Sequence, residues 1–404
     1  MHRRAKAAIA AALLALGLGG CLGGGDDAPE APRGVLTVYM SLPARGLSAD
    51  EARAVDAGAR LAFRRADGHA GPHVVRLIRL DSTRAEGELW DPGQVQANAE
   101  RAKDDPSAVA YIGEFGLGAS AISVPVTNDA GLLQISPLES LTSLTREPPG
   151  RAGRGAPERY YPTGRRNFMR LVPTDLREVD LITARAGTLG ARRVGLVAGE
   201  GVYAEELASQ LVERLRGAGH TLVAADDLTD DPTAPRARAA QLAEQRPDAI
   251  VYAGLGDRSA ERLLAALADL LPSTPVLVGS GVLYRTPLRF PRAPERVEAF
   301  SPIGPVSGDG PAARRVLRAV AARYGAAAAR PEALYGYAAA EIALGAVATG
   351  GGRRAAVVRA AFTGGTPPSP LGRLRVTRVG DAEDAPMTLY RLEEGVFRPV
   401  ANAG

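Results

Sequence analysis

The feature of this 404-residue chain that most constrains its fold is a regular alternation of short apolar segments with amphipathic ones. The first apolar segment is Val35–Met40, and apolar residues at helical spacing follow from Ala52 to Phe63, after a capping-box pattern at Ser48 and Glu51. Further strands are predicted at Val74–Leu80, Val109–Ile112, Leu132–Ile135, Val194–Val197, Thr221–Ala224, Ala249–Tyr252 and Val276–Val278. Helices are predicted between them at 94–103, 119–129, 176–188, 202–216, 234–245 and 259–271.

Strands that are apolar throughout indicate parallel sheets with helices on both faces. Right-handed crossovers between such strands give two doubly wound units. After about residue 300 the pattern changes. Helices are then expected at 311–324 and 332–347, followed by strands at 371–377, 387–391 and 396–399. The predicted fold class is therefore α/β, with two doubly wound, Rossmann-like lobes between which the chain crosses repeatedly.

One segment, Glu147–Arg166, interrupts the alternation. It is rich in proline, glycine and arginine and has no apolar periodicity, so it is predicted to be a loop or an insertion. Two interpretations remain open at this point. The segment is either a disordered flap over a cleft or a docking element that presents Tyr160 and Tyr161 to a partner.

The N-terminus has the pattern of an export signal. Three basic residues precede an apolar run from Ala7 to Gly20. A helix of this run would span about 21 Å, which is short of the roughly 30 Å hydrocarbon core of a membrane. Residues 1–20 are therefore predicted to be a secretory signal peptide.

The end of this signal resembles a bacterial lipobox. It reads Leu18-Gly19-Gly20-Cys21, and in such signals the cysteine is acylated and becomes the mature N-terminus. The alternative is an ordinary secretory signal with a chance cysteine. Residues 21–34 then form a predicted flexible tether. We expect an extracytoplasmic lipoprotein that is anchored to the cell membrane at Cys21.

Composition excludes several classes of function. Cys21 is the only cysteine, which excludes internal disulfides and multi-cysteine metal sites. The formal charge of +4 includes three positive residues within the predicted signal, and aromatic residues make up only 5% of the chain. The two lysines, Lys6 and Lys103, do not follow a glycine, which excludes a P-loop. No nucleic-acid partner is expected.

Catalytic patterns are also missing from the sequence. The motifs H-E-x-x-H, G-x-S-x-G and C-x-x-C do not occur. The four histidines lie in the predicted signal or in predicted turns, at His2, His69, His73 and His220. We therefore expect neither an enzyme nor a bound cofactor or metal.

A glycine-rich turn follows the predicted strand Val109–Ile112. Gly116–Ala121 matches the pattern G-x-G-x-x-A and opens a predicted helix, and Glu139 follows about twenty residues later. A dinucleotide site is the weaker interpretation, because the turn belongs to the third βα unit of an exported chain. The helix N-terminus could instead hold a carboxylate, or the turn could be purely structural.

Several short strings, in their order and spacing, are similar to those of type I periplasmic binding proteins, and specifically to the leucine/isoleucine/valine-binding family of ABC importers. They are Met40-Ser41-Leu42-Pro43, Tyr111-Ile112-Gly113, Ile135-Ser136-Pro137, Arg170-Leu171-Val172-Pro173-Thr174-Asp175 and Tyr335-Gly336-Tyr337-Ala338-Ala339-Ala340. The resemblance covers residues 35 to 400. It implies a lobe 1 at 35–172 with 303–372 and a lobe 2 at 173–302 with 373–400. The lobes would be joined by hinge crossovers and would close over a small ligand.

The resemblance also implies the binding residues. A ligand carboxylate would be held by a helix start and by a hydroxyl after the next strand. These positions correspond to Leu117, Gly118, Ala119, Ser120, Leu138 and Ser140. Leu117 stands where a serine is common, so that side chain gives no hydrogen bond. From lobe 2, Tyr203 would cover the ligand, and Leu255 stands at a second aromatic position.

The sequence departs from the family at Gly279-Ser280-Gly281, where amino-acid binders carry a glutamate that pairs with the ligand ammonium. A buried ammonium without a counter-charge would cost several kcal/mol. Either Glu114, Glu139 or Asp257 supplies the charge, or the ligand has no ammonium. The alternative for each of these three acids is a solvated loop position.

Four leucines, Leu47, Leu117, Leu138 and Leu255, are projected toward the cleft and indicate an apolar pocket. The predicted function is capture of a branched-chain amino acid or similar apolar carboxylate and its delivery to an ABC permease by a monomeric lipoprotein. The alternative is a ligand-sensing or envelope-interaction lipoprotein of the same fold.

Overall fold

The computed structural model describes residues 34–402, except for 87, 225–227, 229–230, 232, 284–288, 305–309, 365–368, 373 and 384. The predicted signal peptide (residues 1–20), the lipidation site Cys21 and the tether as far as residue 33 lie outside the described residues.

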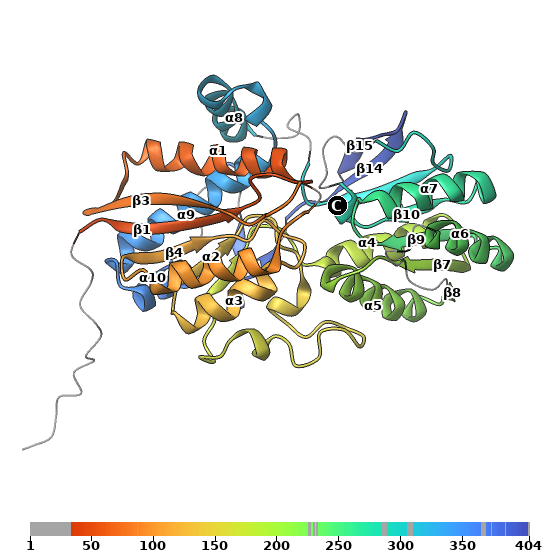
Figure 1. The fold of residues 1–404 in the computed structure, drawn as a ribbon, viewed down its shortest axis with the longest axis horizontal. Coiled ribbons are helices and arrows are strands. Elements are labelled where there is room, and N and C mark those ends of the chain that lie inside the picture. The colour runs from red at the N-terminus through yellow and green to blue at the C-terminus, as the bar shows by residue number, and fades with distance from the viewer. Residues whose placement is uncertain are drawn as a thin grey trace, which may run out of the picture. The chain divides into compact units, whose positions relative to one another are not determined.

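Six strands form the first sheet, in the order β2-β3-β1-β4-β5-β6. Figure 1 shows β3, β1 and β4 side by side. Their bounds are β1 Leu36–Leu42, β2 His69–Ala70, β3 His73–Asp81, β4 Ala108–Ile112, β5 Leu133–Ser136 and β6 Phe168–Arg170. Neighbouring strands are parallel, except that β2 runs antiparallel to β3. Parallel strands place their carboxyl ends at one edge of the sheet, where loops from different strands meet.

Helices cover both faces of this sheet. Their bounds are α1 Ala49–Arg65, α2 Pro92–Asp104, α3 Ser120–Asp129, α8 Pro311–Tyr324, α9 Glu332–Gly350 and α10 Arg354–Thr363. The helices α1, α9 and α10 share a core with Val38 and Met40 of β1, whereas α2 packs against Tyr39 on the opposite face. This alternation follows from the two-residue period of a strand. We call the first sheet and its helices lobe 1.

Seven strands form the second sheet, in the order β15-β14-β11-β10-β9-β7-β8. Their bounds are β7 Arg193–Ala198, β8 Thr221–Ala224, β9 Ala249–Ala253, β10 Val276–Val278, β11 Val297–Ser301, β14 Thr388–Glu393 and β15 Val396–Asn402. The first five are parallel, and β14 and β15 add an antiparallel edge. The helices are α4 Asp175–Thr188, α5 Val202–Gly217, α6 Ala234–Gln245 and α7 Arg258–Leu270. We call this sheet and its helices lobe 2.

The chain passes from lobe 1 to lobe 2 after β6 and returns from β11 to α8, whose helix packs against α1. It then reaches lobe 2 again through β14. The predicted fold class, two doubly wound α/β lobes with repeated crossings, is confirmed. The numerical lobe boundaries, 35–172 with 303–372 and 173–302 with 373–400, remain a prediction.

Some local predictions were wrong. The strand expected at 371–377 is reduced to β12 (Arg375–Val376), which pairs with β13 (Ala382–Glu383). The strand β11 and the helix α10 were not predicted. At the start of α1 the Ser48 side chain makes no capping hydrogen bond, and Glu51 is paired with Arg330 at 3.1 Å.

The segment 147–166 is neither a disordered flap nor a tyrosine-presenting loop. It contains a short 3-10 helix at Glu158–Tyr160, and Tyr160 and Tyr161 are each only 5% exposed. Both tyrosines pack with Leu144 and Phe168 of lobe 1. The two rings are therefore part of a core and are not available to a partner.

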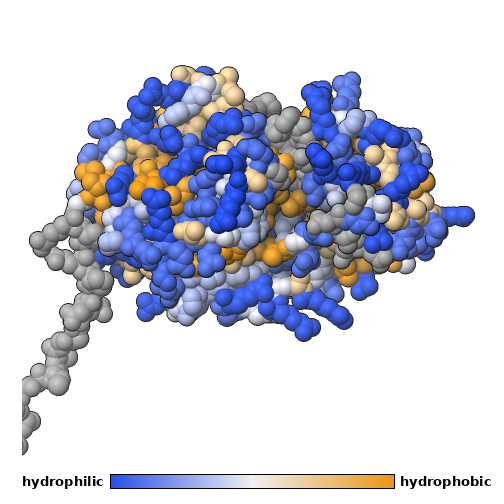
Figure 2. Space-filling model, viewed as in Figure 1, coloured by the Kyte–Doolittle hydropathy of each residue, from blue (hydrophilic) through white to orange (hydrophobic). Residues whose placement is uncertain are grey.

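The face of the molecule drawn in Figure 2 is mostly hydrophilic, with hydrophobic residues in small separate areas. Among the helices of the described residues, none combines the length and the apolar character needed to cross a membrane.

Candidate functional site

The predicted site residues of lobe 1 follow two adjacent strands. The loop after β4 leads to α3, and the loop after β5 runs beside it, because β4 and β5 are parallel neighbours. Gly116 lets the loop after β4 lie directly against the loop after β5. Its φ is +154°, and a Cβ there would lie 2.8 Å from the Leu138 carbonyl oxygen. The carboxyl edge of the sheet thus brings the two predicted loops together.

The start of α3 holds a carboxylate, and that carboxylate belongs to Glu139. The Gly118 N–H donates to Oε1 of Glu139 at 3.0 Å, and the Ser120 N–H donates to Oε2 at 3.1 Å. The Leu141 N–H lies 3.3 Å from Oε1. Glu139 is fully buried. A helix N-terminus favours an anion because its N–H groups lack partners within the helix. In this structure, the chain's own side chain satisfies the amides that were predicted to hold a ligand.

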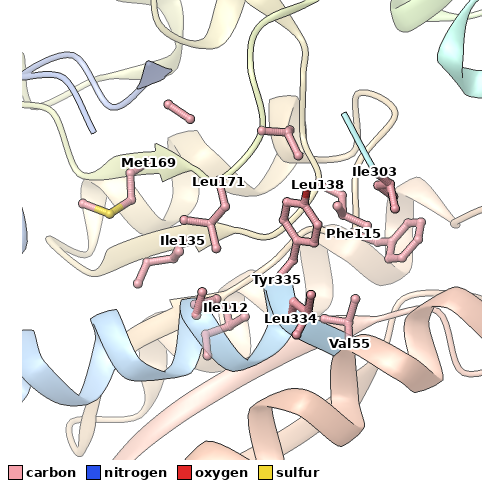
Figure 3. Close-up of a cluster of buried hydrophobic side chains, with 14 of the residues drawn as sticks. Val55, Ile112, Phe115, Ile135, Leu138, Met169, Leu171, Ile303, Leu334 and Tyr335 are labelled. Atoms are coloured by element: carbon pink, nitrogen blue, oxygen red, sulfur yellow. The ribbon is translucent and has the colours of Figure 1, made fainter. Parts of the chain in front are cut away.

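The predicted apolar residues lie in a continuous hydrophobic core. Leu117, Leu138 and Tyr203 are all buried in it, and Leu255 packs against it. Figure 3 shows Leu138 within the cluster that also contains Phe115 and Tyr335. These side chains belong to one hydrophobic cluster that contains residues of both lobes.

The remaining predicted positions lie in loops or at the start of α3. Ala119 directly precedes α3, and the Ser120 hydroxyl accepts the Glu114 N–H at 3.2 Å. A Cβ on Gly118 would lie 3.7 Å from the Tyr203 nitrogen, so the turn faces the start of α5 in lobe 2. Leu47 lies in the loop before α1, where its N–H donates to the Glu88 carbonyl.

The three acids proposed as ammonium partners already have hydrogen-bond donors. Glu139 accepts the amides of α3, as described. Glu114 accepts hydroxyl protons from Ser41 at 2.7 Å and Tyr111 at 2.6 Å, and burial raises its pKa to about 8. Asp257 caps α7 by accepting the Ala260 N–H at 2.9 Å. It lines a cavity of about 50 Å³ together with Leu255.

A different acid reaches the Gly279–Gly281 turn, where the expected glutamate is missing. Glu178 of α4 accepts both the N–H and the hydroxyl of Ser280, the latter at 2.8 Å. The Tyr203 hydroxyl accepts the Gly281 N–H at 3.1 Å. Burial raises the pKa of Glu178 to about 8. Glu178 was not predicted as a site residue, because its sequence position is that of an ordinary acid in the first turn of a helix.

Steric crowding explains why this turn contains glycine at positions 279 and 281. A Cβ on Gly281 would lie 2.8 Å from the Tyr203 ring and 2.9 Å from the Gly254 carbonyl oxygen. A Cβ on Gly279 would lie 2.8 Å from Leu207. The Tyr203 and Leu207 side chains therefore occupy the space that a side chain at either glycine would need.

Asp175, at the start of α4, is the second acid that was missed. It is 1% exposed, and neither carboxylate oxygen has a hydrogen-bond donor. Burial raises its pKa to about 7; the Ser140 hydroxyl opposes this shift, and the charges of Glu206 and Glu139 add to it. The Asp175 N–H donates to the Ser140 carbonyl at 2.9 Å, which ties α4 to the loop after β5.

Further hydrogen bonds join the lobes directly. Glu206 of α5 accepts the Ser143 N–H of lobe 1 at 2.9 Å. The Arg151 and Ala152 N–H groups of the segment 147–166 donate to the Ser209 hydroxyl at 2.8 and 3.2 Å. The lobes therefore contact each other through polar groups beside the candidate site. No group of three acids, histidines or cysteines that could hold a metal occurs in the described part of the chain.

Comparisons with known proteins agree with this fold. A leucine-binding protein, LivK of Thermotoga maritima, is similar with a TM-score of 0.72 and 18% identity, covering 91% of this chain and 98% of that one. A solute-binding protein from R. palustris, solved with benzoate, has a TM-score of 0.70 and 16% identity, covering 92% and 97%. LivJ of Streptococcus pneumoniae, solved with isoleucine, has the same TM-score and identity and covers 91% and 99%.

A search of curated protein sequences found no match. The family model described as "Periplasmic binding protein" matches residues 36–396, which is most of the chain. The resemblance stated from the sequence is confirmed, and with the two-lobed fold it leads to one conclusion: this chain belongs to the periplasmic binding protein family, whose members are solute-binding proteins.

Proposed function

We propose that this protein is an extracytoplasmic, lipid-anchored solute-binding protein that captures a small organic ligand between its lobes and delivers it to an ABC importer. The observation that carries the proposal is the family match over residues 36–396. Buried polar groups at the meeting of the lobes, including Glu139, Asp175 and Glu178, support it. Binding would close the lobes as a hinge motion, and the permease would bind the closed form.

The ligand class predicted from the sequence is a branched-chain amino acid or an apolar carboxylate. The proposed contacts are Leu117, Gly118, Ala119, Ser120, Leu138, Ser140, Tyr203 and Leu255. A ligand carboxylate that uses the Gly118 and Ser120 N–H groups has to displace the Glu139 carboxylate from them. The Ser140 hydroxyl lies close enough to Asp175 to lower its pKa, and it remains in the proposal as a partner for a polar ligand group.

The first test is a thermal-shift screen of the purified chain against amino acids, keto acids, short fatty and aromatic acids, amides, amines and nucleosides. A ligand at about 100 times its Kd adds roughly 2.7 kcal/mol, which raises Tm by a few degrees. Ser140→Ala and Gly118→Val should weaken the binding of any hit by about tenfold or more while the fold is kept. Unchanged affinity in both variants would place the ligand elsewhere.

Anchoring and delivery need separate measurements. Labelled palmitate should be incorporated into the wild-type chain and not into Cys21→Ser. Uptake of the identified ligand should require the cognate permease and the membrane-bound protein. If Cys21→Ser stays in the membrane fraction and is still labelled, the lipid-anchor proposal fails.

The alternative, an envelope-interaction lipoprotein of the same fold, is favoured by the direct contacts between the lobes at Ser143–Glu206 and at Arg151–Ser209. Such contacts suit a molecule that keeps a fixed lobe arrangement. A screen without any hit, together with copurification of an envelope enzyme in place of a permease, would support this alternative.

A further inference from the structure

Two independent features of the candidate site indicate which sign of charge a ligand there would carry. The first is the position of Glu139. Its two carboxylate oxygens accept the N–H groups of Gly118 and Ser120 at the start of α3, and the residue is fully buried. A ligand carboxylate at this helix start would meet the Glu139 carboxylate at a buried position, where two like charges repel strongly.

The second feature is Asp175, whose oxygens have no hydrogen-bond donor although the residue is 1% exposed. Buried carboxylates normally accept hydrogen bonds, so two open oxygens at the meeting of the lobes call for a donor. The Ser140 hydroxyl is close enough to act on its charge. Asp175 therefore offers acceptors where a ligand would lie.

The groups that surround Asp175 are mostly acidic. Glu139 approaches from lobe 1, Glu206 from α5, and Glu178 from the next turn of α4. The Arg170 guanidinium lowers the pKa of Asp175, but it already donates to the Glu139 and Leu141 carbonyls and to Thr145. Its Nε also lies 3.1 Å from Asp381. A further positive charge would balance this set of acids.

We propose that the site takes an organic cation: a primary amine that carries an apolar group and no carboxylate, with its ammonium between Asp175 and Ser140. The inference rests on the proposed function, since the ligand is the one that the lobes enclose. An ammonium has three donors, which matches the two open oxygens of Asp175 and the Ser140 hydroxyl. The apolar group packs against Leu117, Tyr203 and Leu255, which lie in or against one core. Because Asp175 is buried, the lobes separate to admit the ligand.

The test compares three compounds with the same isobutyl group: isoamylamine, which has only the amine; leucine, which has both charges; and isocaproate, which has only the carboxylate. Calorimetry on the full chain should detect isoamylamine binding. Leucine should bind at least about tenfold more weakly, and isocaproate should not bind. Tighter binding of leucine or isocaproate than of isoamylamine overturns the inference and leaves the proposed function standing. Absence of isoamylamine binding also overturns it, and the proposed function is then decided by the wider ligand screen and by uptake.

Separate variants test the role of Asp175 and the role of Glu139. Asp175→Asn should weaken isoamylamine binding by about tenfold or more, because a charge-assisted hydrogen bond is lost. The matched control is Asp180→Asn on the same helix, whose partly exposed carboxylate pairs with Arg214, and it should bind as the wild type does. Equal loss in both variants, or in neither, contradicts the assignment.

Glu139→Ala should free the N–H groups of Gly118 and Ser120. Acetate should then raise the Tm of this variant and not that of the wild type, and isocaproate should begin to bind. If Glu139→Ala does not fold in buffer, folding on addition of acetate would equally show that acetate replaces the Glu139 carboxylate. A variant that folds and ignores acetate and isocaproate contradicts the role of Glu139 as an internal substitute for a ligand carboxylate.

Discussion

At the scale of single residues, the centre of this molecule is unusual for its buried acids. Glu114, Glu139, Asp175, Glu178 and Glu206 are each at most 2% exposed. Burial disfavours the charged form of a carboxyl, and it raises the pKa values of Glu114 and Glu178 to about 8 and that of Asp175 to about 7. Such groups link proton binding to folding.

The first prediction is a pH dependence of stability. In the unfolded chain the pKa values of Glu178 and Glu114 lie near the ordinary glutamate value of 4.5, whereas in the fold burial raises both to about 8. Between these values the folded state holds more protons, so the free energy of unfolding should fall as the pH rises from about 5 to 8 and then level off. Urea denaturation at a series of pH values measures this.

Glu178→Gln is the control for that measurement. Glutamine keeps the shape and an acceptor for Ser280 but carries no charge that would be repelled by Asp175 or penalised by burial near Tyr203. The decline with pH should be shallower in this variant. An identical slope in wild type and variant would mean that Glu178 does not titrate in this range.

A second residue-scale prediction concerns Arg170, a fully buried arginine that is ion-paired with Asp381 at 3.1 Å. Arg170→Met should destabilise the fold by about 3–5 kcal/mol, because it removes one partner of a buried charge pair. The double variant Arg170→Met with Asp381→Asn should recover part of that loss. Chemical denaturation gives all three values, and a double variant that is less stable than the single one would contradict this explanation.

At the scale of elements, the backbones of α1 and α9 pack closely against each other. A Cβ on Gly58 of α1 would lie 1.8 Å from the Ala333 carbonyl oxygen, and a Cβ on Gly336 of α9 would lie 2.0 Å from the Val55 carbonyl oxygen. These two glycines let the helix backbones approach each other directly. They explain how a helix from the C-terminal part of the chain closes the core of lobe 1.

The prediction at this scale uses two glycines in the same helix pair. Gly58→Ala should destabilise the fold by about 1–3 kcal/mol, because the backbones must move apart. Gly345→Ala, on α9 with open space around its Cβ position, should stabilise it by about 0.5–1 kcal/mol through helix propensity. Thermal unfolding of the two variants should shift in opposite directions, and equal shifts would mean that the glycine contact is not tight in solution.

At the scale of the whole molecule, the lobes are linked by the segment 147–166. Its Tyr160 and Tyr161 are buried in lobe 1, while its Arg151 and Ala152 N–H groups bond to Ser209 of lobe 2. A Cβ on Gly150 would lie 2.3 Å from the Ser209 hydroxyl oxygen, so the loop passes very close to α5. The segment therefore acts as a tie between the lobes.

We expect Ser209→Ala to loosen this tie. The amide protons of Arg151 and Ala152 should exchange with solvent about tenfold faster or more, because each loses its acceptor. Amides in the strands of the two sheets, such as those of β4 and β9, should exchange at unchanged rates and serve as the control. Uniformly faster exchange would indicate global destabilisation, and unchanged exchange at Arg151 and Ala152 would show that the tie is not maintained in solution.

The type and order of most elements, the α/β class with two lobes, the family and the loops that meet at the edge of the sheet could all be predicted from the amino-acid sequence. Each of these follows from local patterns: apolar periodicity, glycines at turns and strings of a few residues at regular spacing. The sequence also indicated that the start of α3 suits a carboxylate, because a helix N-terminus carries this preference wherever it lies.

Which groups occupy these positions could not be predicted, because it depends on contacts between residues far apart in the chain. Glu178 reaches Ser280 across 102 residues of sequence, and Glu139 reaches the Gly118 N–H across 21. Locally, Glu178 looks like any acid in the first turn of a helix, and Glu139 resembled a loop acid. Contacts between distant elements depend on how whole lobes pack, and no local pattern of residues encodes that packing. The placement of buried charge where the two lobes meet, at Asp175 and Glu139, is therefore a property of the fold.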